Sequence, residues 1–148
     1  MANIVKTGHV GLNVTDVRRS TQFYNTVLGL ETITESSVPG REFAFIGRAG
    51  EIVLTLWRQS DGQFQKKVPG LHHLSFQVET VEDVRAVEAR VKQAGGKLHY
   101  DGVVPHAEGA ESGGIFFEDP DGIRLEVFAP HGVSGSVPTP GAPSCGFF

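Results

Sequence analysis

HHLSFQVETV, residues 72–81, is the stretch that decides the fold, because a similar stretch occurs earlier in the chain. Residues 8–17 read GHVGLNVTDV, and alignment of the two segments places His9 over His73. Apolar positions coincide as well: Leu12 aligns with Phe76, Val14 with Val78 and Val17 with Val81. An internal repeat of this kind predicts two copies of one structural module.

Each copy predicts the same order of elements. Both segments begin with alternating apolar and polar residues, which indicates a strand, and both then run into a helix. Thr15 or Asp16 is expected to cap the first helix, while Thr80 and Asp83 form a capping-box start for the second. Glycines are expected to end both helices in a left-handed conformation: Gly29 for the first, Gly95 and Gly96 for the second.

Three strand-like runs are expected after each helix: residues 31–36, 41–47 and 51–58 in the first copy, and 97–104, 113–118 and 122–128 in the second. The predicted fold class is therefore α+β, built from two βαβββ modules. Module one covers residues 4–58 and module two residues 71–129, within a single domain of residues 1–129 that a Pro/Gly-rich tail follows.

Composition excludes several classes of protein. A chain of 148 residues with 39% hydrophobic residues is long enough for one folded domain with a proper core. A net charge of −4 argues against a nucleic-acid binder, which usually carries a basic patch. No apolar run reaches the length of a membrane span or of a signal-peptide core, so we expect no membrane partner and a cytoplasmic location. The single cysteine, Cys145, excludes an internal disulfide and a multi-cysteine zinc site.

The adjacent histidines should point to opposite faces, because neighbouring side chains alternate in a strand. His73 aligns with His9 and is expected to face inward, whereas His72 aligns with Gly8 and is expected to face outward. An inward histidine can also be a hydrogen-bonded core residue. The occurrence of two histidines at equivalent positions of the repeat favours a shared functional role.

Glu126 is the third unusual inward residue. LTLW at 54–57 aligns with LEVF at 125–128, which places Thr55 where the second copy has Glu126. A buried carboxylate is costly unless it is paired or bound to a metal. An ion pair with Arg124, or with a partner chain, is the alternative to metal binding.

His9, His73 and Glu126 together form the ligand set of a catalytic divalent metal. Two imidazoles and one carboxylate favour Fe²⁺ or Mn²⁺, and Ni²⁺, Co²⁺ or Zn²⁺ can occupy similar sites. The aspartates of the DPDG stretch, Asp119 and Asp121, are expected to serve a tight turn instead.

The sequence also resembles a known family. GHVGLNV, FYNTVLGL, HHLSFQV and EDPDGIRLEVF together are similar to the vicinal oxygen chelate superfamily, the group of glyoxalases, bleomycin resistance proteins and extradiol dioxygenases, over about residues 4–129. The resemblance implies a cupped mixed sheet around a metal. It implies ligands from the first and last strand of each module, which here are His9, Thr55, His73 and Glu126.

Thr55 departs from the glyoxalase I pattern, because a hydroxyl is a poor fourth ligand for a divalent metal. The resemblance therefore implies a three-ligand enzyme that acts on a small substrate through adjacent oxygens, as a dioxygenase, lyase or transferase. Glyoxalase I proper and antibiotic resistance are further possibilities within the group. A metal-free drug-binding protein, or a small-molecule sensor, is the alternative. Family members commonly pair, so a homodimer is expected.

Candidate pocket residues lie in both copies. Arg41 could bind an anion and Trp57 could form an aromatic wall, while Tyr100, His106 and Glu108 lie in or near the polar loop 105–114. No residue is singled out as the catalytic base. His99, His106 and His131 stand in polar contexts, which predicts solvated rather than catalytic side chains.

The tail, residues 130–148, is rich in Pro, Gly and Ser and ends in Phe147-Phe148. Its composition predicts disorder, whereas the two aromatic residues predict packing against a partner subunit or over the cup.

Overall fold

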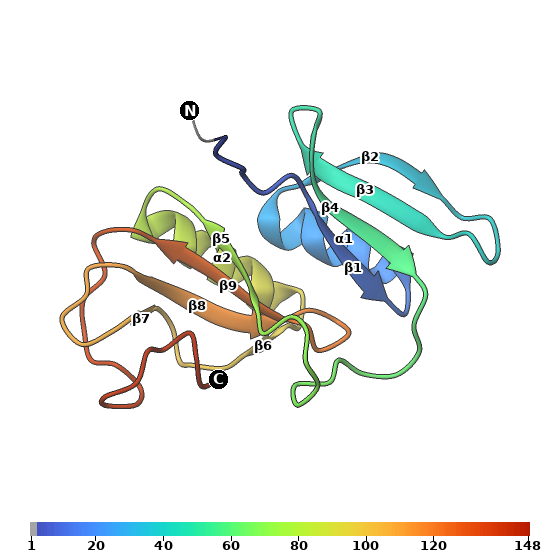
Figure 1. Ribbon diagram of the computed structural model, residues 1–148. Helices are drawn as coiled ribbons and strands as arrows, with labels where there is room; N and C mark the ends of the chain where they lie inside the picture. The colour runs from blue at the N-terminus through green and yellow to red at the C-terminus, as the bar shows by residue number, and fades with distance from the viewer. Residues whose placement is uncertain (1–2) are drawn as a thin grey trace. The chain divides into compact units, whose positions relative to one another are not determined.

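The structure is a computed structural model that describes residues 3–148. The chain forms two compact units, Met1–Gly62 and Gln63–Phe148, and each contains one sheet and one helix (Figure 1). The predicted α+β class is confirmed, and the first unit has the βαβββ order of elements, which the second unit repeats with one additional short strand. Within residues 3–148, neither helix has the length and hydropathy that a membrane span requires.

The first unit is a four-stranded mixed sheet with one helix. Its elements are β1 (Val10–Val14), α1 (Val17–Leu28), β2 (Glu31–Ser36), β3 (Phe43–Arg48) and β4 (Glu51–Arg58). The strand order is β1-β4-β3-β2, with β1 parallel to β4 and the other pairs antiparallel. Apolar residues of α1 and of the sheet form the core, and the largest of them have no exposed surface: Tyr24, Ile46, Leu54 and Leu56.

Local signals explain where helix α1 begins and ends. Asp16 is the N-cap, and its side chain accepts a hydrogen bond from the backbone N–H of Arg19. Gly29 ends the helix with φ 68°, a left-handed conformation that glycine adopts without steric cost. Of the two caps that the sequence offered, the structure uses Asp16.

The second unit repeats this plan with an additional short strand. Its elements are β5 (Leu74–Gln77), α2 (Val81–Gln93), β6 (Lys97–Leu98), β7 (Val104–Pro105), β8 (Gly113–Glu118) and β9 (Arg124–Ala129). The order is β5-β9-β8-β6, with β5 parallel to β9, and β7 pairs with β8. The predicted capping box of Thr80 and Asp83 is present at the start of α2. Buried valines on one side of α2 pack toward the sheet: Val84, Val87 and Val91.

The predicted strand 97–104 is wrong as a continuous element. The strand stops after Leu98, the chain bends through residues 99–102, and pairing resumes only at Val104–Pro105. Gly102 has φ +81°, which an extended strand does not contain. The Asp101-Gly102 pair is a turn signal, and here it outweighs the apolar pattern.

The tail folds back on the second unit. Val133 and Val137 are buried, and Ser144 is only 3% exposed. Backbone hydrogen bonds join Val133 to Glu111 and Ser144 to His106, so residues 130–148 follow the loops between β7 and β8 (Figure 1). The expectation of a disordered tail is therefore wrong. The tail has few apolar residues, but backbone hydrogen bonds to loops of its own unit help to hold it in place.

Candidate functional site

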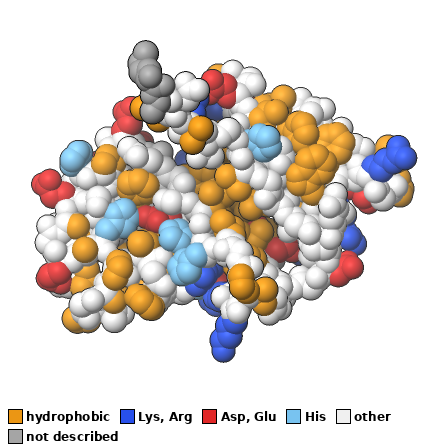
Figure 2. Space-filling view, in the orientation of Figure 1, with side chains coloured by type: hydrophobic (Ala, Val, Ile, Leu, Met, Phe, Trp, Pro, Cys, Tyr) orange, Lys and Arg blue, Asp and Glu red, His pale blue; other side chains and the backbone are white. Residues whose placement is uncertain are grey.

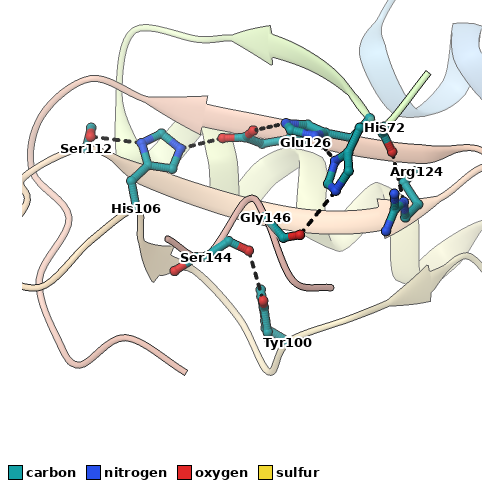
Figure 3. A network of polar contacts seen from close by, with 9 residues as sticks. His72, Tyr100, His106, Ser112, Arg124, Glu126, Ser144 and Gly146 are labelled. Atoms are coloured by element: carbon teal, nitrogen blue, oxygen red, sulfur yellow. Dashed lines mark hydrogen bonds and ion pairs between the residues drawn. The ribbon is translucent and has the colours of Figure 1, made fainter. Parts of the chain in front are cut away.

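Glu126 forms the centre of a polar cluster on the second unit. It lies in β9, between β5 and β8, and only 3% of its surface is exposed. His73 Nε2 lies 3.3 Å from Glu126 Oε2, and His106 Nε2 contacts Glu126 Oε1 (Figure 3). The buried carboxylate is thus paired with two histidines rather than with Arg124.

Arg124 is hydrogen-bonded to main-chain oxygens instead of to Glu126. Its Nε donates to the main-chain oxygen of His72 at 2.9 Å, and its Nη1 donates to the main-chain oxygen of Phe148 at 2.6 Å. The alternative of an ion pair between Glu126 and Arg124 is wrong, since the guanidinium is committed to these two oxygens of the backbone.

His72 does not simply face away from the sheet. Strand β5 begins only at Leu74, so the strict alternation of a strand does not extend to the two histidines. His72 Nδ1 lies 2.7 Å from His73 Nδ1, and His72 Nε2 lies 3.1 Å from the main-chain oxygen of Gly146 (Figure 3). His72 is exposed, yet it remains part of the network.

For two rings that each carry one proton, these contacts are satisfied by a single pair of tautomers. The Gly146 oxygen can only accept, so His72 donates from Nε2 and accepts at Nδ1. His73 therefore donates from Nδ1, and its Nε2 presents a lone pair toward Glu126. Burial lowers the pKa of His73 against the opposing effect of Glu126, which favours the neutral ring.

His73 and Glu126 therefore fit a divalent ion. Their facing atoms are both lone-pair donors, 3.3 Å apart at the edge of a buried carboxylate. Ligand atoms about 2.0–2.2 Å from an ion stand about 2.8–3.1 Å apart at octahedral angles and about 3.3–3.6 Å apart at tetrahedral angles. Neutral imidazole and carboxylate are also the protonation states that bind metals.

The third predicted ligand, His9, belongs to the first unit. It is exposed and directly precedes β1. Within residues 3–148, no three His, Cys, Asp or Glu side chains form a group that could hold a metal ion. The second unit by itself supplies two suitable donors.

Thr55 lies on β4 beside Gly11 of β1. It is 3% exposed, and its hydroxyl accepts a hydrogen bond from Trp57 Nε1 at 3.0 Å. A Cβ at Gly11 would lie 3.2 Å from Thr55 Oγ1, so glycine leaves room for the hydroxyl and the indole.

An aromatic cluster extends this face of the first unit. The rings of Phe43, Phe45 and Trp57 lie 5.2–5.6 Å apart, and all three side chains are partly exposed. Figure 2 shows hydrophobic side chains gathered over this part of the sheet. Trp57 and the exposed Arg41 line one hollow, together with Phe43 and Arg58.

The remaining candidates lie in the second unit. Tyr100 donates from its hydroxyl to the main-chain oxygen of Ser144 at 2.9 Å, and burial raises its pKa. His99 and His106 are partly buried, His106 contacts Glu126, and His99 Nε2 lies 3.3 Å from Glu118 Oε1, so the expectation that they are solvated is wrong. His131 is 81% exposed and lies 3.8 Å from Glu111, and Glu108 is exposed. Asp119 accepts from the N–H groups of Asp121 and Ile123, as a turn residue does.

The ring of Phe148 lies beside the histidines, a position that the sequence indicated only as packing over the cup or against a partner subunit. This ring packs against His73 at 5.6 Å, His99 at 5.0 Å and Phe116 at 4.8 Å between centroids. The only signal was the pair of aromatic residues at the end of an otherwise polar tail.

Comparison with known proteins gives one family. A model of the "Glyoxalase/Bleomycin resistance protein/Dioxygenase superfamily" matches residues 6–127. The "Trivalent organoarsenical cleaving enzyme" of a Bacillus species is 29% identical over 126 residues, 84% of this chain and 73% of that protein. The "Probable lactoylglutathione lyase" of a Synechocystis species is 28% identical over 125 residues, 80% of this chain and 91% of that protein.

Solved structures share the fold. A "glyoxylase/bleomycin resistance protein/dioxygenase domain" from a Frankia species aligns with a TM-score of 0.73 at 26% identity, over 87% of this chain and all of that one. The fosfomycin resistance protein FosX of Listeria monocytogenes, solved with Mn(II), aligns with a TM-score of 0.65 at 23% identity, over 86% of this chain and 93% of that one.

Proposed function

The chain belongs to the glyoxalase/bleomycin resistance protein/dioxygenase superfamily, and we propose that it is a divalent-metal-dependent enzyme whose small substrate binds through two adjacent oxygens. Both curated relatives have enzyme names, one for organoarsenical cleavage and one for a lyase. We propose Fe²⁺ or Mn²⁺ as the favoured metal, with His9, His73 and Glu126 as its ligands.

One observation carries the proposal. The partly buried His73 Nε2 and the buried Glu126 Oε2 face each other at 3.3 Å. Two lone pairs at this distance repel each other unless a proton or a cation lies between them, and a divalent ion can accept both. His9, at the equivalent position of the first module, is the proposed third ligand.

The residues of the chain have distinct proposed roles. When bound, the divalent ion supplies Lewis-acid chemistry toward two oxygens of the substrate. Glu126 neutralises part of the ion's charge from a rigid central strand. The rings of Phe43, Phe45 and Trp57 offer an apolar wall, and Arg41 beside Trp57 offers a positive charge for an anionic substituent.

Thr55 narrows the choice of reaction. Its hydroxyl is buried and already accepts a hydrogen bond from Trp57, so it is a weak metal ligand. Three protein ligands leave more positions for substrate or a co-reactant, which favours dioxygenase, lyase or transferase chemistry over glyoxalase I chemistry.

A metal-free drug-binding protein is the second candidate. The observation that favours it is the aromatic cluster of Phe43, Phe45 and Trp57, since partly exposed rings can stack on a planar ligand.

Elemental analysis separates these candidates. Protein purified without a metal-affinity tag should contain about one divalent ion per chain, or bind one when Fe²⁺ or Mn²⁺ is added anaerobically. Glu126→Gln is isosteric and should lose most of that ion. A wild-type protein that binds no divalent metal, yet binds planar drugs, would favour the second candidate. A screen of catechols, vicinal diols, α-keto compounds and epoxide antibiotics with thiols should then identify the reaction.

A further inference from the structure

The geometry points to His106 as a positioning residue: it holds Oε1 of Glu126 so that Oε2 is presented to the metal beside His73. This inference rests on the proposed function. His106 affects the binding of the ion only through Glu126 and does not contact the ion itself.

The two oxygens of Glu126 have separate partners. Oε2 lies beside His73, whereas Oε1 is hydrogen-bonded to His106 Nε2. A carboxylate whose rotation is fixed through one oxygen presents the other in one direction only. Hydrogen bonds of this kind orient metal ligands and raise the affinity of the site.

His106 is itself held on both sides. Its Nε2 is hydrogen-bonded to the carboxylate of Glu126, which accepts, and its Nδ1 lies 2.9 Å from the hydroxyl of Ser112, which can donate to a ring protonated at Nε2 (Figure 3). Its backbone N–H bonds to the Ser112 oxygen, and its own oxygen accepts from Ser144. The imidazole also packs on Phe128, with centroids 5.1 Å apart.

The same geometry argues against His106 as a ligand. Nε2 of His106 is directed at Oε1 of Glu126, whereas Nε2 of His73 is directed at Oε2. The two imidazoles therefore do not converge on one point. The nitrogen that a metal would need is already hydrogen-bonded to Oε1 of Glu126.

The test compares metal affinity with the number of bound imidazoles. His106→Leu removes both hydrogen bonds, His106→Gln keeps a donor for Glu126, and Ser112→Ala removes the bond that fixes the tautomer. His131→Leu is the control, because His131 is exposed in the same unit. Affinity for Mn²⁺ is measured by competition with a chelator, and bound imidazoles are counted by pulsed EPR of the Cu²⁺-loaded protein.

His106→Leu should weaken Mn²⁺ binding about 10–100-fold, with an unchanged imidazole count. His106→Gln should recover most of the affinity, Ser112→Ala should lose part of it, and His131→Leu should match wild type. Loss of one imidazole in His106→Leu would make His106 a ligand and overturn the inference, as would unchanged affinity. A wild type that binds no metal would instead overturn the proposed function, and this inference with it.

Discussion

The ring of Phe148 packs against the imidazole of His73, with centroids 5.6 Å apart and planes inclined at 70°. The guanidinium of Arg124 lies 5.3 Å from the centre of the same ring and also binds the Phe148 main-chain oxygen. The tail therefore covers a proposed metal ligand from within its own unit.

Removal of this ring should expose His73. Phe148→Ala should increase the rate at which diethyl pyrocarbonate modifies His73, because the imidazole loses its aromatic cover. Phe147→Ala is the matched control, since Phe147 is 73% exposed. Mass spectrometry of the peptide that contains His72 and His73 measures the change, and equal rates in both variants would show that the tail does not shield the site.

Thr55 should determine whether the protein isomerises the hemithioacetal of methylglyoxal and glutathione. We expect negligible formation of lactoylglutathione by the metal-loaded wild type, since a hydroxyl replaces the fourth strong ligand. Thr55→Glu supplies a carboxylate there, and Thr55→Gln is its uncharged control. Rapid turnover by the wild type, followed at the absorbance of the thioester, would contradict this account.

Acid should destabilise the fold partly through His99. Burial lowers the pKa of His99 below its ordinary value of 6.5; Glu118 opposes this shift, and Lys66, Lys97 and Arg124 add to it. The unfolded chain then binds a proton more tightly than the native state, so stability is lost as pH falls below 6.5. His99→Gln should reduce this loss in urea unfolding, whereas the exposed His131→Gln should not. An unchanged pH dependence in His99→Gln would rule out this contribution.

Assembly gives a further prediction. The first unit has a partly exposed aromatic cluster, and Ile33 and Val38 of the same unit are 40% and 56% exposed. Apolar surface of this kind favours pairing, and a two-fold dimer is the commonest assembly. Light scattering should give twice the 15.9 kDa mass of the chain. A monomeric mass at micromolar concentration would exclude the proposed homodimer.

Much of the fold could be predicted because its signals are local. The repeat of residues 8–17 in 72–81 gave two modules, Gly29 ended a helix where a left-handed residue was needed, and Thr80 with Asp83 started another. The burial of Glu126 also followed from its place among apolar residues of one strand.

Contacts between distant parts of the chain could not be predicted in this way. His106 is hydrogen-bonded to Glu126, and Tyr100 to Ser144. These contacts involve loops and a tail whose sequences have no periodic pattern of apolar residues. The contact of the exposed His72 with His73 did not follow from the strand phase, because β5 begins only after the two histidines.

The central claim is that His73, and not its neighbour His72, binds a divalent ion together with Glu126. Equilibrium dialysis with Mn²⁺ tests it most directly on wild type, His73→Ala and His72→Ala. We expect about one ion per chain for wild type, none for His73→Ala, and about one, bound more weakly, for His72→Ala, because His72 only fixes the tautomer of His73. Equal retention of metal by both variants would contradict the account.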